Sequence, residues 1–193
     1  MSGYQIKVTL DVHPKAWRRL QIPSKITFKE LSAILIESMG WEGYHLSGFS
    51  INKAGETIFV ENYPDDEGLQ REYKREGVLD GKKVKIDKYL IENDKFLFIY
   101  DYGDNWKHEI LLEEVLEDYK NKYAQVVTYR GNCPPEDCGG YLGYIKLMYG
   151  EDEEAEEMRQ YYEIFKYNKA KTNENLKNLK EIEKALEEMF EDE

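Results

Sequence analysis

The sequence has little cysteine, no long apolar run and no excess of positive charge, and each shortage excludes a class of protein. Two cysteines among 193 residues cannot form the disulfide framework of a small secreted domain. No stretch approaches the roughly 18 consecutive apolar residues of a membrane-spanning helix, and no apolar run follows a basic start as in a secretion signal. We therefore expect a cytoplasmic protein with no membrane association.

The balance of charge is negative, with 39 acidic residues against 27 basic ones and a formal net charge of −12. Binding to a phosphate backbone depends on clustered Lys and Arg, so direct general DNA binding is not expected. The acidity is uneven, because residues 151–193 hold 15 of the 39 acidic and 7 of the 27 basic residues. We expect the C-terminal segment to present acidic faces and the preceding body to be only mildly acidic.

The patterning of the first 150 residues predicts a sheet and one well-defined helix. Residues 4–12 alternate between apolar and polar, as in a half-buried strand. Thr27 and Glu30 have the spacing of a capping box, an apolar stripe follows, and Gly40 is placed to end a helix over 27–39. Further strands are expected near 16–22, 45–51, 96–101, 106–112 and 123–129. The predicted fold class is α+β, a compact roll with a mixed or antiparallel sheet, the long helix packed on it, and C-terminal helices.

The C-terminal segment shows helical spacing of apolar residues over 155–165 and again over 176–190. We expect one domain over 1–193, in which a body of 1–150 carries an acidic helical segment of 151–193 docked on it. The docking side chains are predicted to be Tyr161, Phe165, Leu179, Ile182 and Leu186.

Two other features have open interpretations. The charged stretch 61–81 is predicted to be a long surface excursion with a short helical piece near 69–75, and it is either a flap or a plain insertion. The Arg18-Arg19 pair is interpreted as part of an exposed strand face, with anion binding as the alternative.

Polar chemistry concentrates in two loops. A tight turn within the predicted hairpin 100–109 holds Asp101, Asp104, Trp106 and His108, which is more polar chemistry than a turn requires. The loop 131–144 is rich in Gly and contains two adjacent prolines, so it is expected to be irregular. Buried polar groups without partners cost about 1–3 kcal/mol each, and we therefore expect the two loops to meet and satisfy each other.

These motifs, taken in order over residues 4–150, resemble the plasmid pRiA4b ORF-3-like proteins. The resemblance is carried by Trp17-Arg18-Arg19, by Gly40-Trp41 with Tyr44-His45 and Phe49, by Tyr100-Asp101-Tyr102-Gly103-Asp104-Asn105-Trp106-Lys107-His108, and by Pro134-Pro135-Glu136-Asp137-Cys138-Gly139-Gly140 with Gly143-Tyr144. The charged 61–81 excursion and the acidic C-terminal helices match no motif of that family.

The resemblance implies a compact α+β roll and an association with plasmids and mobile elements. Some members of the family are labelled transposon resolvases, a label that this sequence does not support. A serine resolvase needs a nucleophilic Ser backed by arginines and a basic DNA-binding helix, whereas this acidic chain has no basic recognition helix.

Three interpretations of the two loops remain open. The first is a non-catalytic binding module for a protein, peptide or small ligand, with no cofactor. Its cleft would be lined by Trp41, His45, Asp101, Asp104, Trp106, His108, Glu136, Asp137 and Tyr144. The second is a metal-binding protein or metal-dependent hydrolase that uses the His, Asp and Glu residues of the same cleft. Its weak candidates for metal ligands are the two histidines, His45 and His108, and the two cysteines, Cys133 and Cys138. The third is a buried polar network that only fixes the loops. His45 is predicted to approach the loops if they form a functional site and to lie elsewhere if they do not.

Overall fold

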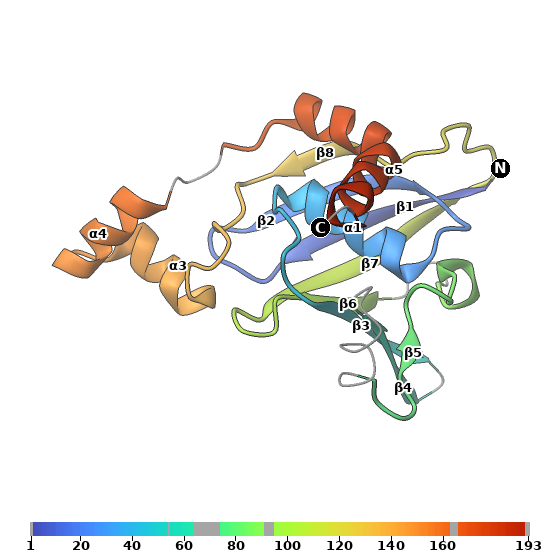
Figure 1. Cartoon of the computed structure of the whole chain (residues 1–193), viewed down its shortest axis with the longest axis horizontal. Coiled ribbons are helices and arrows are strands. Elements are labelled where there is room, and N and C mark those ends of the chain that lie inside the picture. The colour runs from blue at the N-terminus through green and yellow to red at the C-terminus, as the bar shows by residue number, and fades with distance from the viewer. Residues whose placement is uncertain (1, 54, 64–73, 91–94, 163–165, 192–193) are drawn as a thin grey trace.

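The computed structural model describes residues 2–53, 55–63, 74–90, 95–162 and 166–191, with the backbone alone described over 182–191. Eight strands form one sheet in the order β5-β4-β3-β6-β7-β1-β2-β8 (Figure 1). All neighbours pair antiparallel except β4 and β5, which pair parallel. The strands are β1 (Gly3–Leu10), β2 (Ala16–Pro23), β3 (Ser47–Lys53), β4 (Glu56–Asn62), β5 (Leu79–Asp80), β6 (Lys95–Tyr100), β7 (Trp106–Leu116) and β8 (Gln125–Arg130). The predicted α+β fold with a mixed sheet is confirmed.

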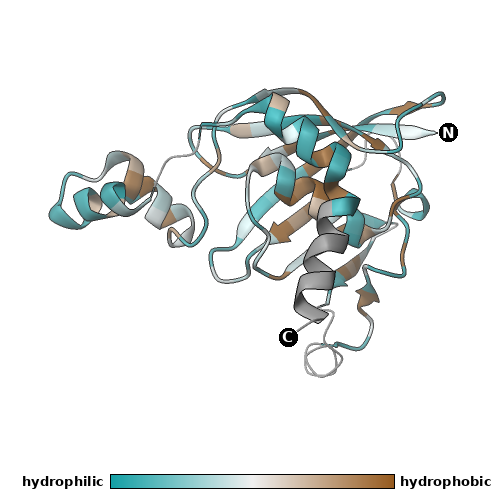
Figure 2. Cartoon of the chain, turned by 45° about the horizontal axis from the view of Figure 1, so that its top comes forward, coloured by the Kyte–Doolittle hydropathy of each residue, from teal (hydrophilic) through white to brown (hydrophobic). Residues whose placement is uncertain are grey.

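Two helices cover one face of this sheet. Helix α1 (Phe28–Met39) and helix α5 (Lys169–Glu191) lie over the strands, and the ribbon of the sheet beneath them includes hydrophobic residues, drawn in brown (Figure 2). The alternation in β1 places Ile6, Val8 and Leu10 on the buried side, because successive strand residues point to opposite faces. The core therefore lies between the sheet and the two helices.

Helix α1 begins and ends as its capping box and Gly40 predicted. The Thr27 side chain accepts a hydrogen bond from the Glu30 N–H, and the Glu30 side chain accepts one from the Thr27 N–H. Gly40 ends the helix in the left-handed conformation, with φ of 92°. A short 3-10 turn, η1 (Ile86–Lys88), follows a segment that pairs with the start of α1 through a bridge between Thr27 and Lys85.

The predicted C-terminal helices differ from the structure in their bounds. Regular structure begins earlier than expected, because helix α3 (Gly140–Tyr149) starts inside the Gly-rich loop and helix α4 (Glu153–Tyr161) follows it. Together α3 and α4 extend away from the sheet (Figure 1). The prediction that Tyr161 docks on the body is wrong, since its side chain is 81% exposed at the end of α4.

The other predicted docking residues divide between the core and the part not described. Leu179 packs against the core, and Leu176, which was not among the predicted residues, is buried beside it. Phe165 and the side chains of Ile182 and Leu186 lie outside the described residues. Residues 64–73 of the 61–81 excursion, which include 69–73 of the expected helical piece, also lie outside them, and strand β4 occupies residues for which no strand was predicted.

The burial of Arg18 contradicts the interpretation of the Arg18-Arg19 pair as part of an exposed strand face. Its side chain is fully buried, whereas Arg19 is partly exposed and forms an ion pair with Glu113 at 2.6 Å. The Arg18 guanidinium donates to the carbonyls of Trp17, Ser38, Arg130 and Gly131 and to the Cys133 sulfur, at 2.8 to 3.3 Å. It also lies 3.7 Å from the centre of the Tyr167 ring. One side chain thus joins α1, β2, the end of β8 and the segment that precedes α5.

No helix in the described part of the chain is long and apolar enough to cross a membrane.

We predict that Arg18→Ala lowers the free energy of unfolding by at least about 3 kcal/mol, because it removes donors from buried carbonyls and leaves a cavity. Urea unfolding followed by circular dichroism measures this change. The matched control is Arg19→Ala, which removes a partly exposed ion pair and is expected to cost less than about 1 kcal/mol. Equal losses in the two variants would contradict the structural role assigned to Arg18.

Candidate functional site

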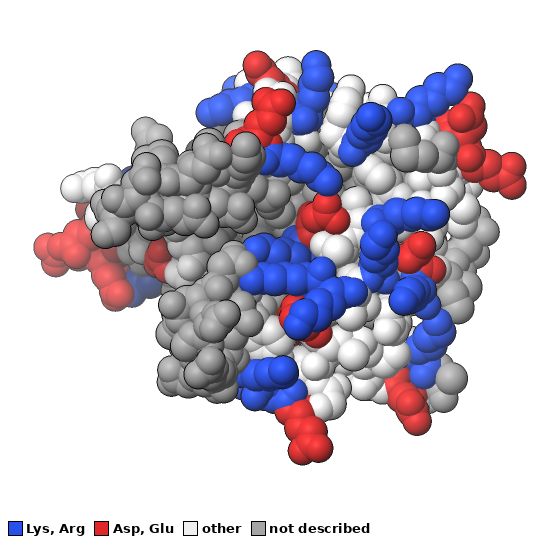
Figure 3. All heavy atoms as spheres, turned by 45° about the vertical axis from the view of Figure 1, so that its right-hand side comes forward, with Lys and Arg blue, Asp and Glu red and all other residues white. Residues whose placement is uncertain are grey.

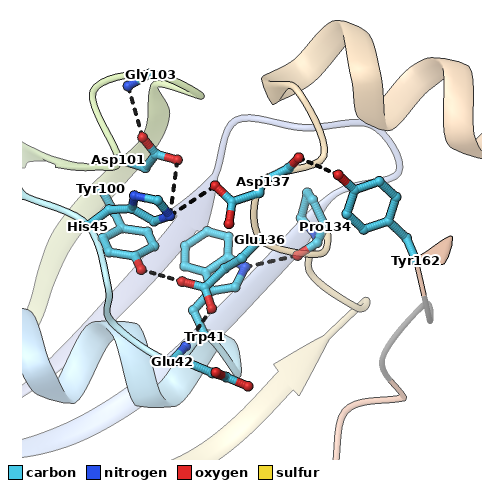
Figure 4. Close-up of polar contacts among 10 residues, drawn as sticks. All are labelled: Trp41, Glu42, His45, Tyr100, Asp101, Gly103, Pro134, Glu136, Asp137 and Tyr162. Carbon is cyan, nitrogen blue, oxygen red and sulfur yellow. Dashed lines mark hydrogen bonds and ion pairs between the residues drawn. The ribbon is translucent and has the colours of Figure 1, made fainter. Parts of the chain in front are cut away.

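Three loops meet at one edge of the sheet (Figure 4). The first follows α1 at residues 41–46, the second joins β6 to β7 at 101–105, and the third leads from β8 into α3 at 131–139. The indole N–H of Trp41 donates to the Pro134 carbonyl at 2.8 Å. A Cβ atom at Gly140 would lie 2.7 Å from the Asp104 carbonyl oxygen, so only glycine permits this approach. The prediction that the hairpin turn and the Pro-Pro-Glu-Asp loop meet is confirmed.

Each loop contributes one residue to a cluster of metal-ligating atoms. His45 Nε2 lies 3.1 Å from Asp137 Oδ1 and 3.8 Å from Asp101 Oδ2. The three ligand atoms all lie within 4.8 Å of one another, and no other such group of three occurs among the described residues. The carboxylates differ in exposure, since the Asp101 side chain is 10% exposed and that of Asp137 is 66% exposed. His45 therefore approaches the two loops, as the functional interpretation requires.

Two residues of this cluster have left-handed backbone conformations. Asp101 has φ of 55° and Asp137 has φ of 57°, and Asn105, in the same turn as Asp101, has φ of 57°. Such conformations cost of order 1–3 kcal/mol for residues other than glycine, although Asp and Asn tolerate them best. In this turn Asp101 and Asn105, and not Gly103, take the left-handed conformation.

Hydrogen bonds hold both strained residues in place. Asp101 Oδ1 accepts from the Gly103 N–H at 2.9 Å, and the Asp101 N–H donates to the Leu46 carbonyl at 2.9 Å. The Asp137 carbonyl accepts from the Tyr162 hydroxyl at 2.5 Å. These contacts leave Asp101 Oδ2 and the Asp137 carboxylate directed toward His45 (Figure 4).

Glu136 connects the third loop to the other two through hydrogen bonds. Its carboxylate accepts hydrogen bonds from the Tyr100 hydroxyl and, at 2.7 Å, from the Glu42 N–H. Burial, and then the adjacent Glu136 carboxylate, raise the pKa of Tyr100 well above its usual range. Tyr100 is therefore a neutral donor at every physiological pH, and Glu136 serves to position the loop that carries Asp137.

Beneath the cluster lies a stack of buried aromatic rings. Trp41 stacks on Tyr100 at 5.2 Å and on Trp106 at 6.0 Å between ring centres. Trp41, Trp106 and Tyr144 are at most 5% exposed, so they are buried and do not form the open walls expected of them. The exposed aromatic rings nearest in sequence are those of Tyr44 and Tyr102.

His108 and the two cysteines do not join the cluster. His108 is fully buried, with Nδ1 3.3 Å from the Phe98 carbonyl and its ring edge-on to Trp41. The Cys133 sulfur accepts from Arg18, and burial raises its pKa to about 11. Burial and the neighbouring Asp104 carboxylate raise the pKa of Cys138 to about 12. Both thiols are protonated, and within the described residues no metal-ligating group includes them.

Asp104 is the remaining candidate, and it lies apart from the cluster. Its backbone packs on Gly140, and its Oδ2 is buried without a hydrogen-bond partner in the described part of the chain. Tyr162, which was not among the predicted site residues, also contacts the site. The Tyr162 hydroxyl reaches a loop 25 residues earlier, and no local pattern in the sequence indicates such a contact.

Grooves flank the cluster on two sides. His45 lines one groove between α1 and strands β3 and β4, together with the polar or charged side chains of Lys29, Ser32, Glu37, Glu42, Ser47 and Asn62. Asp137 and Glu136 line a second groove together with Tyr44 and the segment that follows α1. A ligand in either groove can reach a residue of the cluster.

The chain is similar to other known proteins. The family described as plasmid pRiA4b ORF-3-like protein matches residues 2–175. The uncharacterised protein y4hQ of Sinorhizobium fredii is 31% identical over 146 residues, which are 74% of this chain and 70% of that protein. The crystal structure of protein MM3350 of Methanosarcina mazei, described as of unknown function, has a TM-score of 0.73 at 27% identity. That match covers 88% of this chain and 95% of the other.

His108 gives the protein a predictable acid sensitivity. Burial lowers its pKa from 6.5 to about 4, outweighing its hydrogen bonds to the Phe98 and Trp106 backbone. Below about pH 6.5 the unfolded chain binds a proton at His108, whereas the folded chain binds it only near pH 4. The stability of the folded state therefore falls as the pH drops through this window. We expect His108 to account for about 2–3 kcal/mol of that loss.

Urea unfolding of the wild type and of His108→Gln at pH 4.5 and pH 7 measures this contribution. Gln does not titrate, so the variant should lose less stability than the wild type between the two pH values. His13→Gln, at an exposed histidine, should leave the pH dependence unchanged. The assignment to His108 is contradicted if His108→Gln and the wild type show the same pH dependence.

Proposed function

The chain belongs to the plasmid pRiA4b ORF-3-like family, and from that premise we propose that it is a binding module whose site holds a divalent metal ion through His45, Asp101 and Asp137. One observation carries this proposal. An imidazole and two carboxylates from three separate loops direct their ligand atoms to one point.

The spacing of these atoms suits a transition-metal ion. Ligands bound at about 2.0–2.2 Å in tetrahedral or octahedral geometry lie roughly 3–3.5 Å apart. The two distances from His45 Nε2, 3.1 Å and 3.8 Å, are close to that spacing. Imidazole combined with carboxylate oxygens favours Zn²⁺, Mn²⁺, Fe²⁺ or Co²⁺ over Ca²⁺, which takes oxygen ligands.

The electrostatics of the cluster also support a bound cation. Asp101 and Asp137 bring two negative charges together, and Asp101 is largely buried. A divalent cation placed between two carboxylates is attracted to both of them. His45 Nε2 is buried and has no hydrogen-bond partner in the described residues, because its approach to Asp137 lacks hydrogen-bond geometry. A metal ion would satisfy all three groups.

Three protein ligands leave coordination positions for a ligand molecule. The groove on the His45 side has a volume of about 320 Å³, at the lower end of the range for small-molecule sites. Two buried hydroxyls, Ser32 and Ser47, hydrogen-bond to each other at 2.7 Å in its wall, and Asn62 donates to Ser47. We infer a small polar ligand that gives an oxygen atom to the metal and hydrogen bonds to this wall.

We predict stoichiometric uptake of Zn²⁺ or Mn²⁺ by the metal-free protein in isothermal titration calorimetry. His45→Ala, Asp101→Asn and Asp137→Asn should each lower the affinity by about 100-fold or more. Asn tolerates the left-handed backbone of both aspartates, so these two variants remove charge without removing the local conformation. The metal should also raise the melting temperature, since it binds only the folded state, and a chelator should reverse this.

Asp104→Asn is the matched control, because Asp104 belongs to the same hairpin but lies outside the cluster. It should bind metal as the wild type does. If the wild type takes up no metal, or if Asp104→Asn weakens uptake as strongly as Asp101→Asn, the proposal fails. In that case His45 serves only as an ion-pair partner that ties the three loops together.

A further inference from the structure

The helical pair α3 and α4, residues Gly140–Tyr161, forms an arm with an acidic and aromatic surface. The arm extends away from the sheet in both views (Figures 1 and 2). Its exposed acidic residues are Glu151, Asp152, Glu153, Glu154, Glu156 and Glu157, against the basic residues Lys146 and Arg159. Four large apolar or aromatic side chains of the arm, Tyr141, Leu142, Tyr149 and Tyr161, are 46–81% exposed. A surface of this kind is typical of a contact with another protein.

Within the arm, helices α3 and α4 pack against each other. Ala155 and Leu147 are fully buried where α4 packs on α3. Arg159 donates to the carbonyls of Leu147 and Gly150 at 3.0 and 3.1 Å, and Lys146 pairs with Asp152 and Glu154. Glu151, Glu153, Glu156 and Glu157 have no ion pair among the described residues. The uncompensated negative charge of the arm therefore lies on a preformed surface.

The opposite end of the molecule carries the complementary charge. The chain over 81–86 runs beside the start of α1, with Phe28 N–H donating to the Val84 carbonyl at 3.1 Å and Ile86 N–H to the Ile26 carbonyl at 3.0 Å. Lys53 Nζ adds a hydrogen bond to the Lys88 carbonyl at 3.0 Å. These contacts gather a lysine patch, which we define as Lys25, Lys53, Lys83, Lys85 and Lys88.

The acidic residues described near these lysines are Glu56, which lies opposite Lys53 on β4, and Glu76, Asp80 and Asp87 in the segment 74–90, where Asp80 pairs with Lys83. In a chain with a net charge of −12, a local surplus of lysines is unexpected. Lys and Arg side chains are prominent on this face of the molecule (Figure 3).

We propose that the arm of one copy of this chain docks on the lysine patch of a second copy. The arm and the start of α1 lie at opposite ends of the long axis (Figure 1), so one molecule cannot join its own arm to its own patch. Two copies placed antiparallel make the contact twice, as a two-fold interface requires. Nucleic acid fits the patch less well, because its phosphates would be repelled by the remaining acidic surface.

Charge reversal tests the contact. Lys83→Glu/Lys85→Glu/Lys88→Glu reverses the patch, and Glu153→Lys/Glu156→Lys/Glu157→Lys reverses the arm; all six side chains are exposed. Light scattering coupled to size exclusion should show a wild-type dimer at low ionic strength. The dimer should dissociate at about 1 M salt, where the Debye length is about 3 Å. Each reversed variant alone should associate at least about tenfold more weakly, because like charges then face each other.

An equimolar mixture of the two reversed variants is the decisive sample. The reversed arm of one then faces the reversed patch of the other, and the second contact pairs the original arm with the original patch, so a mixed dimer should form. Circular dichroism checks that each variant is folded. A monomeric wild type at low ionic strength, or a mixture that stays monomeric, overturns the proposal. Binding of a short DNA duplex by monomeric wild type, lost on reversal of the patch, would overturn it in favour of nucleic acid.

Discussion

The buried guanidinium of Arg18 is the contact on which the rest of the structure depends. It comes from the first half of β2, and the partners that the structure gives it among the described residues are carbonyls, a thiol and two aromatic rings. A buried cation without a carboxylate is stabilised only if every donor finds an acceptor. The end of α1, the end of β8 and the segment after it must therefore all reach the same point. Arg18 acts in this way as a template for chain segments that are more than 100 residues apart.

The position of the candidate site follows from that template. Gly131 and Cys133, which accept hydrogen bonds from Arg18, begin the loop that continues through Pro134 to Asp137. The Ser38 carbonyl fixes the last turn of α1, and the next loop starts directly after it with Trp41, whose indole binds Pro134. Two of the three loops are thus placed by one side chain. The third, at Asp101, is held by the β6–β7 hairpin and by Leu46.

Local patterns predicted the parts of this structure that local forces determine. The capping box and Gly40 set the bounds of α1, and alternation identified the strands that pair around β1. The Arg18-Arg19 pair was interpreted as an exposed face, because an arginine is a polar position until its distant acceptors are known, whereas the structure buries Arg18 in β2. Helix α3 was missed because its glycines usually break helices. In this fold Gly143 packs directly on the Cys138 carbonyl, where a Cβ would lie 1.7 Å from the oxygen.

The sequence predicted which residues could belong to the candidate site, but not how they are arranged in space. His45, Asp101 and Asp137 were all among the candidates, yet nothing in the sequence separates them from His108 or Trp106, which the fold buries. What separates them is the left-handed backbone of Asp101 and Asp137, which turns both carboxylates toward His45. Neighbouring hydrogen bonds hold this arrangement in place. Under the proposed function, a cation bound by all three residues would bind only the folded arrangement of the loops, so metal binding would stabilise the ordering of the three loops.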